Sequence, residues 1–186
     1  FAIQRSGQGV LPMIDIRDIP EETRWRLAAE FASRLPALYD AAFRPVAGEK
    51  YDEIEQEIWM ELSRTVPAIA RDLSLPVGSA QALATTMRIV MTILSGPGYA
   101  TEALEVSLDR SVILVRRCPL VEQCNSSGCP GDPVFRRCMV FILTAVPLLN
   151  KKYSARYVRT MCTGDRQCEI KIEPAGDPAG ETQKKR

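Results

Sequence analysis

Apolar positions in the first hundred residues recur every three to four residues, which is the spacing of amphipathic helices. This spacing predicts a first helix that starts after the N-cap residue Asp18. We expect Pro36 to break or kink it, because a proline inside a helix removes one backbone hydrogen bond. A second helix is predicted over residues 49–64. A third is predicted from Gly78-Ser79 to Gly96-Pro97-Gly98, where glycine and proline end a helix.

Beyond residue 99 the apolar period changes from helical to alternating. Alternation on both sides of Asp109-Arg110 predicts a β-hairpin, and a second hairpin is predicted over residues 155–173. Between them, residues 118–132 are rich in Cys, Pro, Gly, Asn and Ser and predict a loop, which precedes a helix over residues 134–152. The predicted fold class is therefore α+β, with two β-hairpins forming an antiparallel sheet packed on helices.

The same pattern predicts one domain with distinct terminal segments. Residues 18–98 form its helical region, and residues 99–173 form the first hairpin, the cysteine loop, a helix and the second hairpin. Residues 1–17 are predicted to be a flexible lead-in. Residues 174–186 are rich in Gly, Pro and charged residues, a composition that predicts a disordered tail.

Composition and charge exclude several classes of protein. Lys and Arg number 24 against 23 Asp and Glu, so the basic excess of a nucleic-acid-binding protein is absent. The longest apolar run, residues 139–149, is shorter than the roughly 20 residues of a membrane span and contains Pro147. The first residues lack the pattern of a secretory signal, so we expect a cytoplasmic protein with reduced thiols. Histidine is absent, which excludes Ser-His-Asp catalysis and histidine-ligated metal sites.

The cysteines all lie in the second half of the chain, and this clustering favours a shared site. Thiolates are ligands that select zinc or an iron–sulfur cluster. The spacings C-x5-C-x4-C-x8-C and C-x5-C match no standard zinc or ferredoxin motif, so spacing alone does not identify the metal. The six residues are Cys118, Cys124, Cys129, Cys138, Cys162 and Cys168.

Other interpretations of the cysteines stay open. Cys138 and Cys162 can instead be small buried core residues, and disulfide bonding is an alternative that a reducing compartment disfavours. The thiols can also be reactive, because nearby cations lower the pKa of a thiol. The neighbouring cations in sequence are Arg116, Arg117, Arg136 and Arg137, for which a solvated surface is the simpler interpretation.

Roughly residues 80–173 resemble the 4-vinyl-reductase-like superfamily and the related L-2-amino-thiazoline-4-carboxylic acid hydrolase-like family. The resemblance is carried by Arg117-Cys118-Pro119-Leu120 with its cysteine loop and helix, by the segment from Tyr157 to Cys162, and by the Gly164-Asp165-x-x-Cys168 strand. It implies a mixed helix and antiparallel-sheet domain that often dimerises and encloses an apolar pocket for a small molecule.

The resemblance also implies a structural zinc ion. Its ligands would be Cys118, Cys162 and Cys168, with a fourth from Cys124, Cys129 or Cys138. This chain departs from the family because it lacks histidine and has extra loop cysteines, which makes a [4Fe-4S] cluster a competing cofactor. No helix-turn-helix precedes the domain, so we expect no direct binding to nucleic acid.

Three functional hypotheses follow. The first is a metal-containing small-molecule-binding or redox-sensing domain, with a pocket between helices and sheet lined by residues such as Met87, Met91, Phe135 and Phe141. The second, which rests on the family name, is a hydrolase in which Asp165 and Glu169 are the candidate carboxylates. The third is a cluster-carrying assembly protein that binds a protein partner through Trp25, Tyr51 and Trp59. We place sensing or accessory function ahead of catalysis.

Overall fold

A computed structural model describes residues 15–107, 109–127 and 131–176. The predicted lead-in and tail therefore fall mostly outside the described residues, and so does the loop cysteine Cys129. The helices are α1 (Glu21–Ala47), α2 (Lys50–Ser63), α3 (Val66–Asp72), α4 (Ala80–Ser95), α5 (Pro119–Ser127) and α6 (Gly131–Leu149), with short 3₁₀ turns η1 (Ile16–Asp18) and η2 (Met161–Thr163). The strands are β1 (Ala100–Ser107), β2 (Arg110–Arg117), β3 (Tyr153–Arg159) and β4 (Cys168–Pro174).

The four strands form one antiparallel sheet in the order β1-β2-β4-β3. The two predicted hairpins are therefore confirmed, and they join through β2 and β4, where Ile113 pairs with Ile170. The side chains of Ile113, Ile170 and Ile172 are almost completely buried, as period-two alternation on a half-buried sheet requires. The general α+β class is confirmed.

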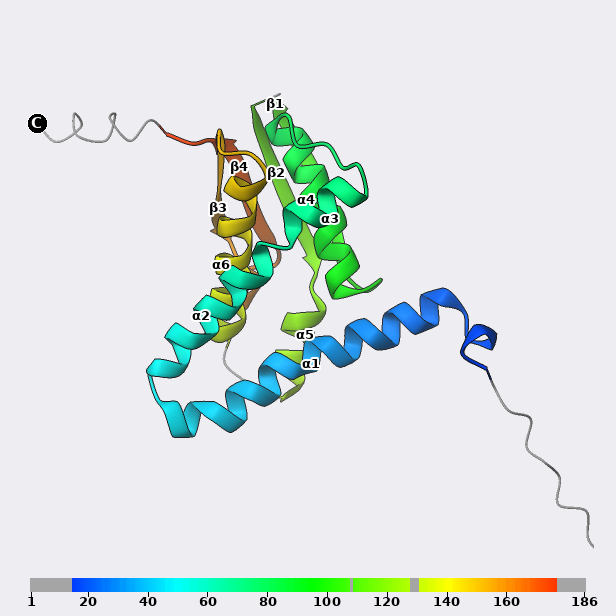
Figure 1. Ribbon diagram of the computed structural model, residues 1–186. Coiled ribbons are helices and arrows are strands. Elements are labelled where there is room, and N and C mark those ends of the chain that lie inside the picture. Colours follow the sequence, from blue (N-terminus) through cyan, green and yellow to red (C-terminus); the bar gives the residue numbers. More distant parts are fainter. Residues whose placement is uncertain (1–14, 108, 128–130, 177–186) are drawn as a thin grey trace, which may run out of the picture.

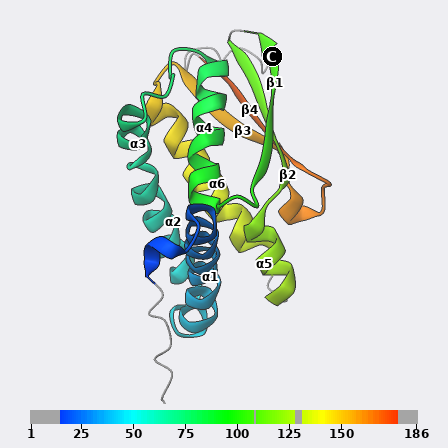
Figure 2. The same ribbon diagram turned by 90° about the vertical axis from the view of Figure 1, so that its right-hand side faces the viewer.

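Helices α4 and α6 cover one face of the sheet (Figures 1 and 2). The core lies between these layers, where Leu83, Met87 and Val90 of α4 meet Ile142 and Val146 of α6. Ser79 caps α4 by accepting a hydrogen bond from the Ala82 amide at 3.1 Å, which explains where the helix begins.

Helices α1 and α2 lie outside these layers and diverge from each other at their shared turn (Figure 1). α2 packs against α6, whereas α1 crosses the ends of α4 and α5. The crossing of α1 and α4 is close, because a Cβ atom at Gly96 would lie 2.6 Å from the Cβ atom of Ala29. Gly96 also has a φ angle of +86°, which favours glycine.

Three local predictions were wrong. α1 continues through Pro36, so the predicted break there is absent, and the Pro36 carbonyl oxygen accepts a hydrogen bond from Arg137 at 3.3 Å. Asp18 belongs to η1, so it does not cap α1. The predicted cysteine loop contains the helix α5, whose first residue is Pro119. Proline suits that position because its missing N–H has no intrahelical partner there. In the described part of the chain, no helix combines the length and apolar character needed to cross a membrane.

Candidate functional site

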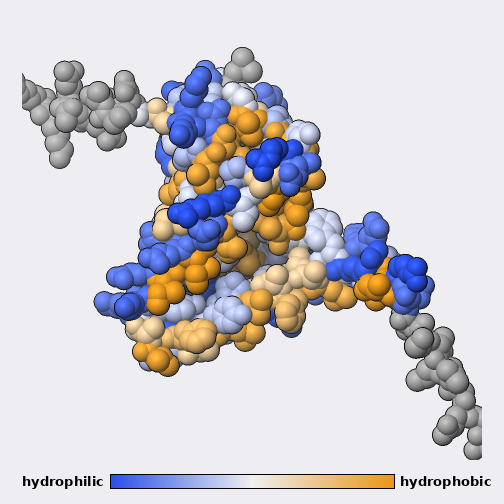
Figure 3. Space-filling model, viewed as in Figure 1, coloured by the Kyte–Doolittle hydropathy of each residue, from blue (hydrophilic) through white to orange (hydrophobic). Residues whose placement is uncertain are grey.

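The main candidate site is a groove of about 980 Å³ that opens between α1 and α2 (Figure 3). Five helices contribute to its walls, and the sheet contributes none of the lining residues. The groove therefore lies on the side of α4 and α6 that faces away from the sheet. The predicted pocket between helices and sheet was misplaced: Met91 and Phe141 line the groove, whereas Met87 is fully buried in the core and Phe135 packs on Tyr157.

The groove is lined mainly by large apolar side chains. Its floor includes Trp59 and Phe141, whose rings pack edge to face with centroids 6.3 Å apart. Its walls carry apolar side chains that remain about half exposed, namely Tyr39, Phe43, Ile54, Ile58 and Leu62. Contiguous apolar surface of this extent is uncommon on a soluble protein unless it binds something.

One end of the groove contains a buried ion pair. Arg137 Nε lies 2.6 Å from Glu55 Oε1, and both side chains are less than a tenth exposed. Tyr51 donates a hydrogen bond to the same carboxylate oxygen at 3.4 Å. Burial, followed by the nearby Glu55 carboxylate, raises the pKa of the Tyr51 phenol, so this hydroxyl stays protonated at neutral pH.

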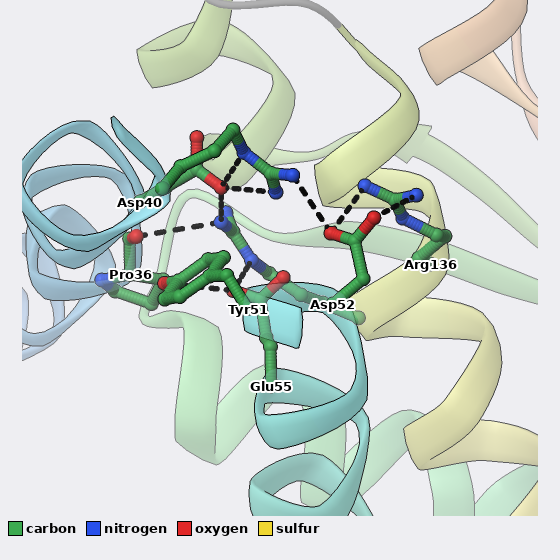
Figure 4. Close-up of polar contacts among 8 residues, drawn as sticks. Pro36, Asp40, Tyr51, Asp52, Glu55 and Arg136 are labelled. Carbon is green, nitrogen blue, oxygen red and sulfur yellow. Dashed lines mark hydrogen bonds and ion pairs between the residues drawn. The ribbon is translucent and has the colours of Figure 1, made fainter. Parts of the chain in front are cut away.

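This pair belongs to a network that joins α1, α2 and α6 (Figure 4). Asp40 of α1 lies 3.5 Å from Arg137 and 2.6 Å from Arg44. Arg44 also contacts Asp52 of α2 at 2.8 Å. Arg136 of α6 binds Asp52 through two hydrogen bonds of 2.9 Å. The network therefore contains three guanidinium groups and three carboxylates, so its charges balance.

The structure brings four of the predicted cysteines to one region. Cys168 begins β4 and pairs with Val115, three residues before Cys118, while Cys162 lies in η2 and Cys138 in α6. All four are free thiols. The pKa of Cys118 rises to about 11 and that of Cys138 rises further, chiefly through burial and then through the neighbouring thiols. Burial also raises the pKa of Cys162 and Cys168.

Hydrogen bonds connect this thiol cluster to the surrounding backbone and hydroxyl groups. Cys138 Sγ lies 2.9 Å from the Tyr157 hydroxyl oxygen, and the Met161 amide donates to Cys168 Sγ at 3.3 Å. Within residues 15–107, 109–127 and 131–176, no group of three or more Cys, Asp or Glu side chains is arranged closely enough to hold a metal ion. Cys124 is buried and takes part in a disulfide, which differs from the predicted reduced thiol.

The arginines do not activate the thiols, so that hypothesis was wrong. Arg116 pairs with Glu102 and Arg117 pairs with Glu122, while Arg136 and Arg137 bind the carboxylates of α2. The pKa of every thiol in the cluster is raised rather than lowered.

The predicted catalytic carboxylates have structural partners. Asp165 accepts a hydrogen bond from the Thr160 amide at 2.9 Å, and Glu169 lies 3.3 Å from Arg159. Of the predicted interface aromatics, Tyr51 and Trp59 line the groove, and Trp25 donates a hydrogen bond to the Ile93 carbonyl at 3.0 Å.

Glu55 was not among the site residues expected from the sequence, and Arg137 was expected beside the thiols. Arg137 lines the groove, and so does Cys138 of the thiol cluster. Glu55 and Arg137 lie 82 positions apart in the chain, so no local pattern connects them. The available signal was an acidic residue inside the apolar stripe of α2, between Ile54 and Ile58.

No known family model matches the chain, and no curated protein sequence matches it either. Several solved structures have a similar fold, and two of them are described here. A trafficking protein particle complex subunit 3 from Naegleria fowleri, covalently bound to palmitic acid, aligns with a TM-score of 0.57 and 11% identity, over 81% of this chain and 96% of that one. The phenol-responsive sensory domain of the transcription activator PoxR, with phenol, aligns with a TM-score of 0.51 and 13% identity, over 77% of this chain and 74% of that one. At these identities the comparison shows a shared α+β fold with a small sheet.

Proposed function

We propose that the protein is a non-enzymatic domain of the 4-vinyl-reductase-like type that binds a small apolar molecule in the groove between α1, α2, α4 and α6. The observation that carries the proposal is the size and character of the groove, about 980 Å³ with walls that are mainly apolar. Pockets that bury small ligands usually have volumes of about 300–1,000 Å³ and a few polar groups among apolar ones. The Glu55–Arg137 pair provides such a polar point.

The two structural neighbours described above support the proposal by analogy. One was solved with palmitic acid and the other with phenol, which are both molecules with an apolar body. We propose that this chain uses the shared fold in the same general way, with a ligand of its own.

Fluorescence of the neutral apolar dye N-phenyl-1-naphthylamine tests this proposal. The dye should become brighter when it binds, and Ile58→Glu should weaken binding at least about tenfold, because the substitution places a charge on the groove wall. Val106→Glu is the matched control, since Val106 is exposed on β1 and does not line the groove. Equal dye binding by both variants, or none by the native protein, would contradict the proposal.

We also propose that Cys118, Cys138, Cys162 and Cys168 hold one zinc ion or an iron–sulfur cluster. Because no three of these side chains lie closely enough in the described structure to hold a metal ion, binding would have to draw the thiols together. The support is that four free thiols, from the end of β2, α6, η2 and β4, influence one another electrostatically. They are soft donors, and a bound metal would deprotonate them and link the end of β2, α6, η2 and β4. Inductively coupled plasma mass spectrometry should find about one zinc ion per chain, or iron with sulfide in brown, anaerobically purified protein. Cys168→Ser should lose the metal, whereas Cys124→Ser should retain it.

A second copy of the chain is the protein partner that we propose. Leu27, Phe31 and Leu38 share one face of α1 and are 49%, 69% and 61% exposed, although none of them lines the groove. A self-complementary two-fold contact would bury this stripe. Light scattering should give twice the chain mass of 20.7 kDa. A monomer at micromolar concentration would contradict this part of the proposal.

A further inference from the structure

The polar end of the groove has hydrogen-bonding capacity that the protein does not use. Arg137 Nε and the Tyr51 hydroxyl both donate to Glu55 Oε1, and Arg137 Nη2 reaches Pro36 and Asp40. Within the described part of the chain, neither Glu55 Oε2 nor Arg137 Nη1 makes a hydrogen bond. One carboxylate oxygen and one guanidinium nitrogen therefore remain available.

These two atoms are in contact with open space rather than sealed in the protein. Among the described residues, the only fully buried side-chain nitrogen or oxygen atom without a partner is Arg24 Nε. Glu55 Oε2 and Arg137 Nη1 consequently keep some accessible surface, and the groove is the space that both residues line. A group that enters this end of the groove meets one strong acceptor and one strong donor.

The charge balance decides which polar group fits. The guanidinium groups of Arg44, Arg136 and Arg137 already offset the carboxylates of Asp40, Asp52 and Glu55. A carboxylate or an ammonium group on the ligand would therefore add one uncompensated charge to a mostly buried site, which is costly. A neutral group adds none.

Resting on the proposed function, we infer that the natural ligand is a neutral molecule with an apolar body and one hydroxyl group, which donates to Glu55 Oε2 and accepts from Arg137 Nη1. A hydroxyl group is the simplest neutral group that does both. An ether oxygen can only accept, so it would leave the Glu55 oxygen without a donor. The apolar body would then extend along Ile54, Ile58 and Phe141.

Displacement of N-phenyl-1-naphthylamine by three probes with the same decyl chain tests this inference at neutral pH. The probes are 1-decanol, its methyl ether 1-methoxydecane, and decanoate. The alcohol should bind at least about tenfold more tightly than the ether, as expected for a hydrogen bond to a charged acceptor. The affinity of the alcohol should exceed that of decanoate by a similar or larger factor. The ether has one more methyl group than the alcohol, and burial of this group favours ether binding. Tighter binding of the alcohol therefore cannot come from a larger apolar surface.

Each result has a separate meaning. Equal displacement by alcohol and ether, or tightest binding of decanoate, would overturn the hydroxyl inference and leave apolar binding in the groove intact. Failure of the dye and all probes to bind would instead overturn the proposed function.

A variant at Glu55 adds a second test. Glu55→Gln keeps the side-chain shape and a hydrogen-bonding end but removes the negative charge. We expect the preference for alcohol over ether to fall to about threefold or less. An unchanged preference in Glu55→Gln would contradict the assigned role of Glu55. If the variant does not fold, the probe series on the native protein still decides the inference.

Discussion

The buried ion pair between Glu55 and Arg137 allows the most specific test of the structural account. Replacing either residue by methionine keeps much of its volume and removes one charge. Glu55→Met leaves Arg137 with Asp40 at 3.5 Å and the Pro36 carbonyl at 3.3 Å. Arg137→Met leaves Glu55 with only the 3.4 Å hydrogen bond from Tyr51. The second substitution therefore isolates its partner more completely.

The burial of the ion pair sets the size of the expected loss in the free energy of unfolding. Removing one partner of a buried ion pair typically costs about 3–5 kcal/mol, because the other charge stays desolvated and unpaired. We expect a loss of about 3 kcal/mol in the free energy of unfolding for Glu55→Met and about 4–5 kcal/mol for Arg137→Met. The double variant replaces both charges by apolar groups, so its stability should lie within about 1 kcal/mol of the native value.

Urea unfolding followed by circular dichroism measures all three changes. Arg156 and Glu173 form the matched control, since their ion pair has the same 2.6 Å separation but side chains that are 54% and 30% exposed. Arg156→Met should cost at most about 1 kcal/mol, as exposed pairs do. Two results would refute the reasoning. One is a loss in the free energy of unfolding below 1 kcal/mol for both Glu55→Met and Arg137→Met, and the other is a double variant whose loss equals the sum of the two single losses.

Three further predictions concern packing, pH and assembly. Gly96→Ala should destabilise the protein by about 2–4 kcal/mol in urea because of the clash with Ala29 and the positive φ, whereas Gly48→Ala, with open space around it, should cost about 1 kcal/mol. The Tyr51 phenol should ionise above its ordinary pKa of 10.0 in a 295 nm titration compared with Tyr51→Phe. Tyr51 of the unfolded chain ionises at a lower pH than Tyr51 of the folded protein. The contribution of the raised Tyr51 pKa to the free energy of unfolding is therefore complete below pH 10 and is lost as the pH rises through and beyond that value. Phe31→Glu should convert the proposed dimer to a monomer in light scattering, and a dimer that persists would exclude the α1 stripe as its interface.

Local sequence patterns predicted much of the fold. The apolar stripe of α4 and its N-cap Ser79 were enough to predict that helix, since both signals depend on residues only a few positions apart. The two hairpins followed from alternation on either side of Asp109-Arg110 and of Gly164-Asp165. The sequence also predicted that the two hairpins form one antiparallel sheet. Which strands pair between them, β2 with β4, depends on contacts between segments that are distant in the chain.

The errors arose where tertiary contacts override a local preference. Pro36 was expected to break or kink α1. The helix does not break there, and the Pro36 carbonyl accepts a hydrogen bond from Arg137 of α6, about a hundred residues later. The segment after Cys118 has a composition typical of loops, yet Pro119 is compatible with the first turn of α5.

The groove could not be derived from the sequence. Ile54 and Ile58 have the spacing of a buried stripe, but they line an open groove and remain 43% and 53% exposed. Periodicity shows that a helix has an apolar face and does not show what covers it. The position of Glu55 beside Arg137 depends on how α2 packs on α6, which no local pattern specifies.

Nuclear magnetic resonance of protein with labelled isoleucine methyl groups tests the central proposal most directly. With 1-decanol added, the account predicts nuclear Overhauser effects between the decyl chain and the methyl groups of Ile54 and Ile58 in the groove. The methyl groups of Ile170 and Ile172, buried on β4, should show none. Contacts to other isoleucines with none to Ile54 and Ile58 would contradict the assignment of the groove as the ligand site.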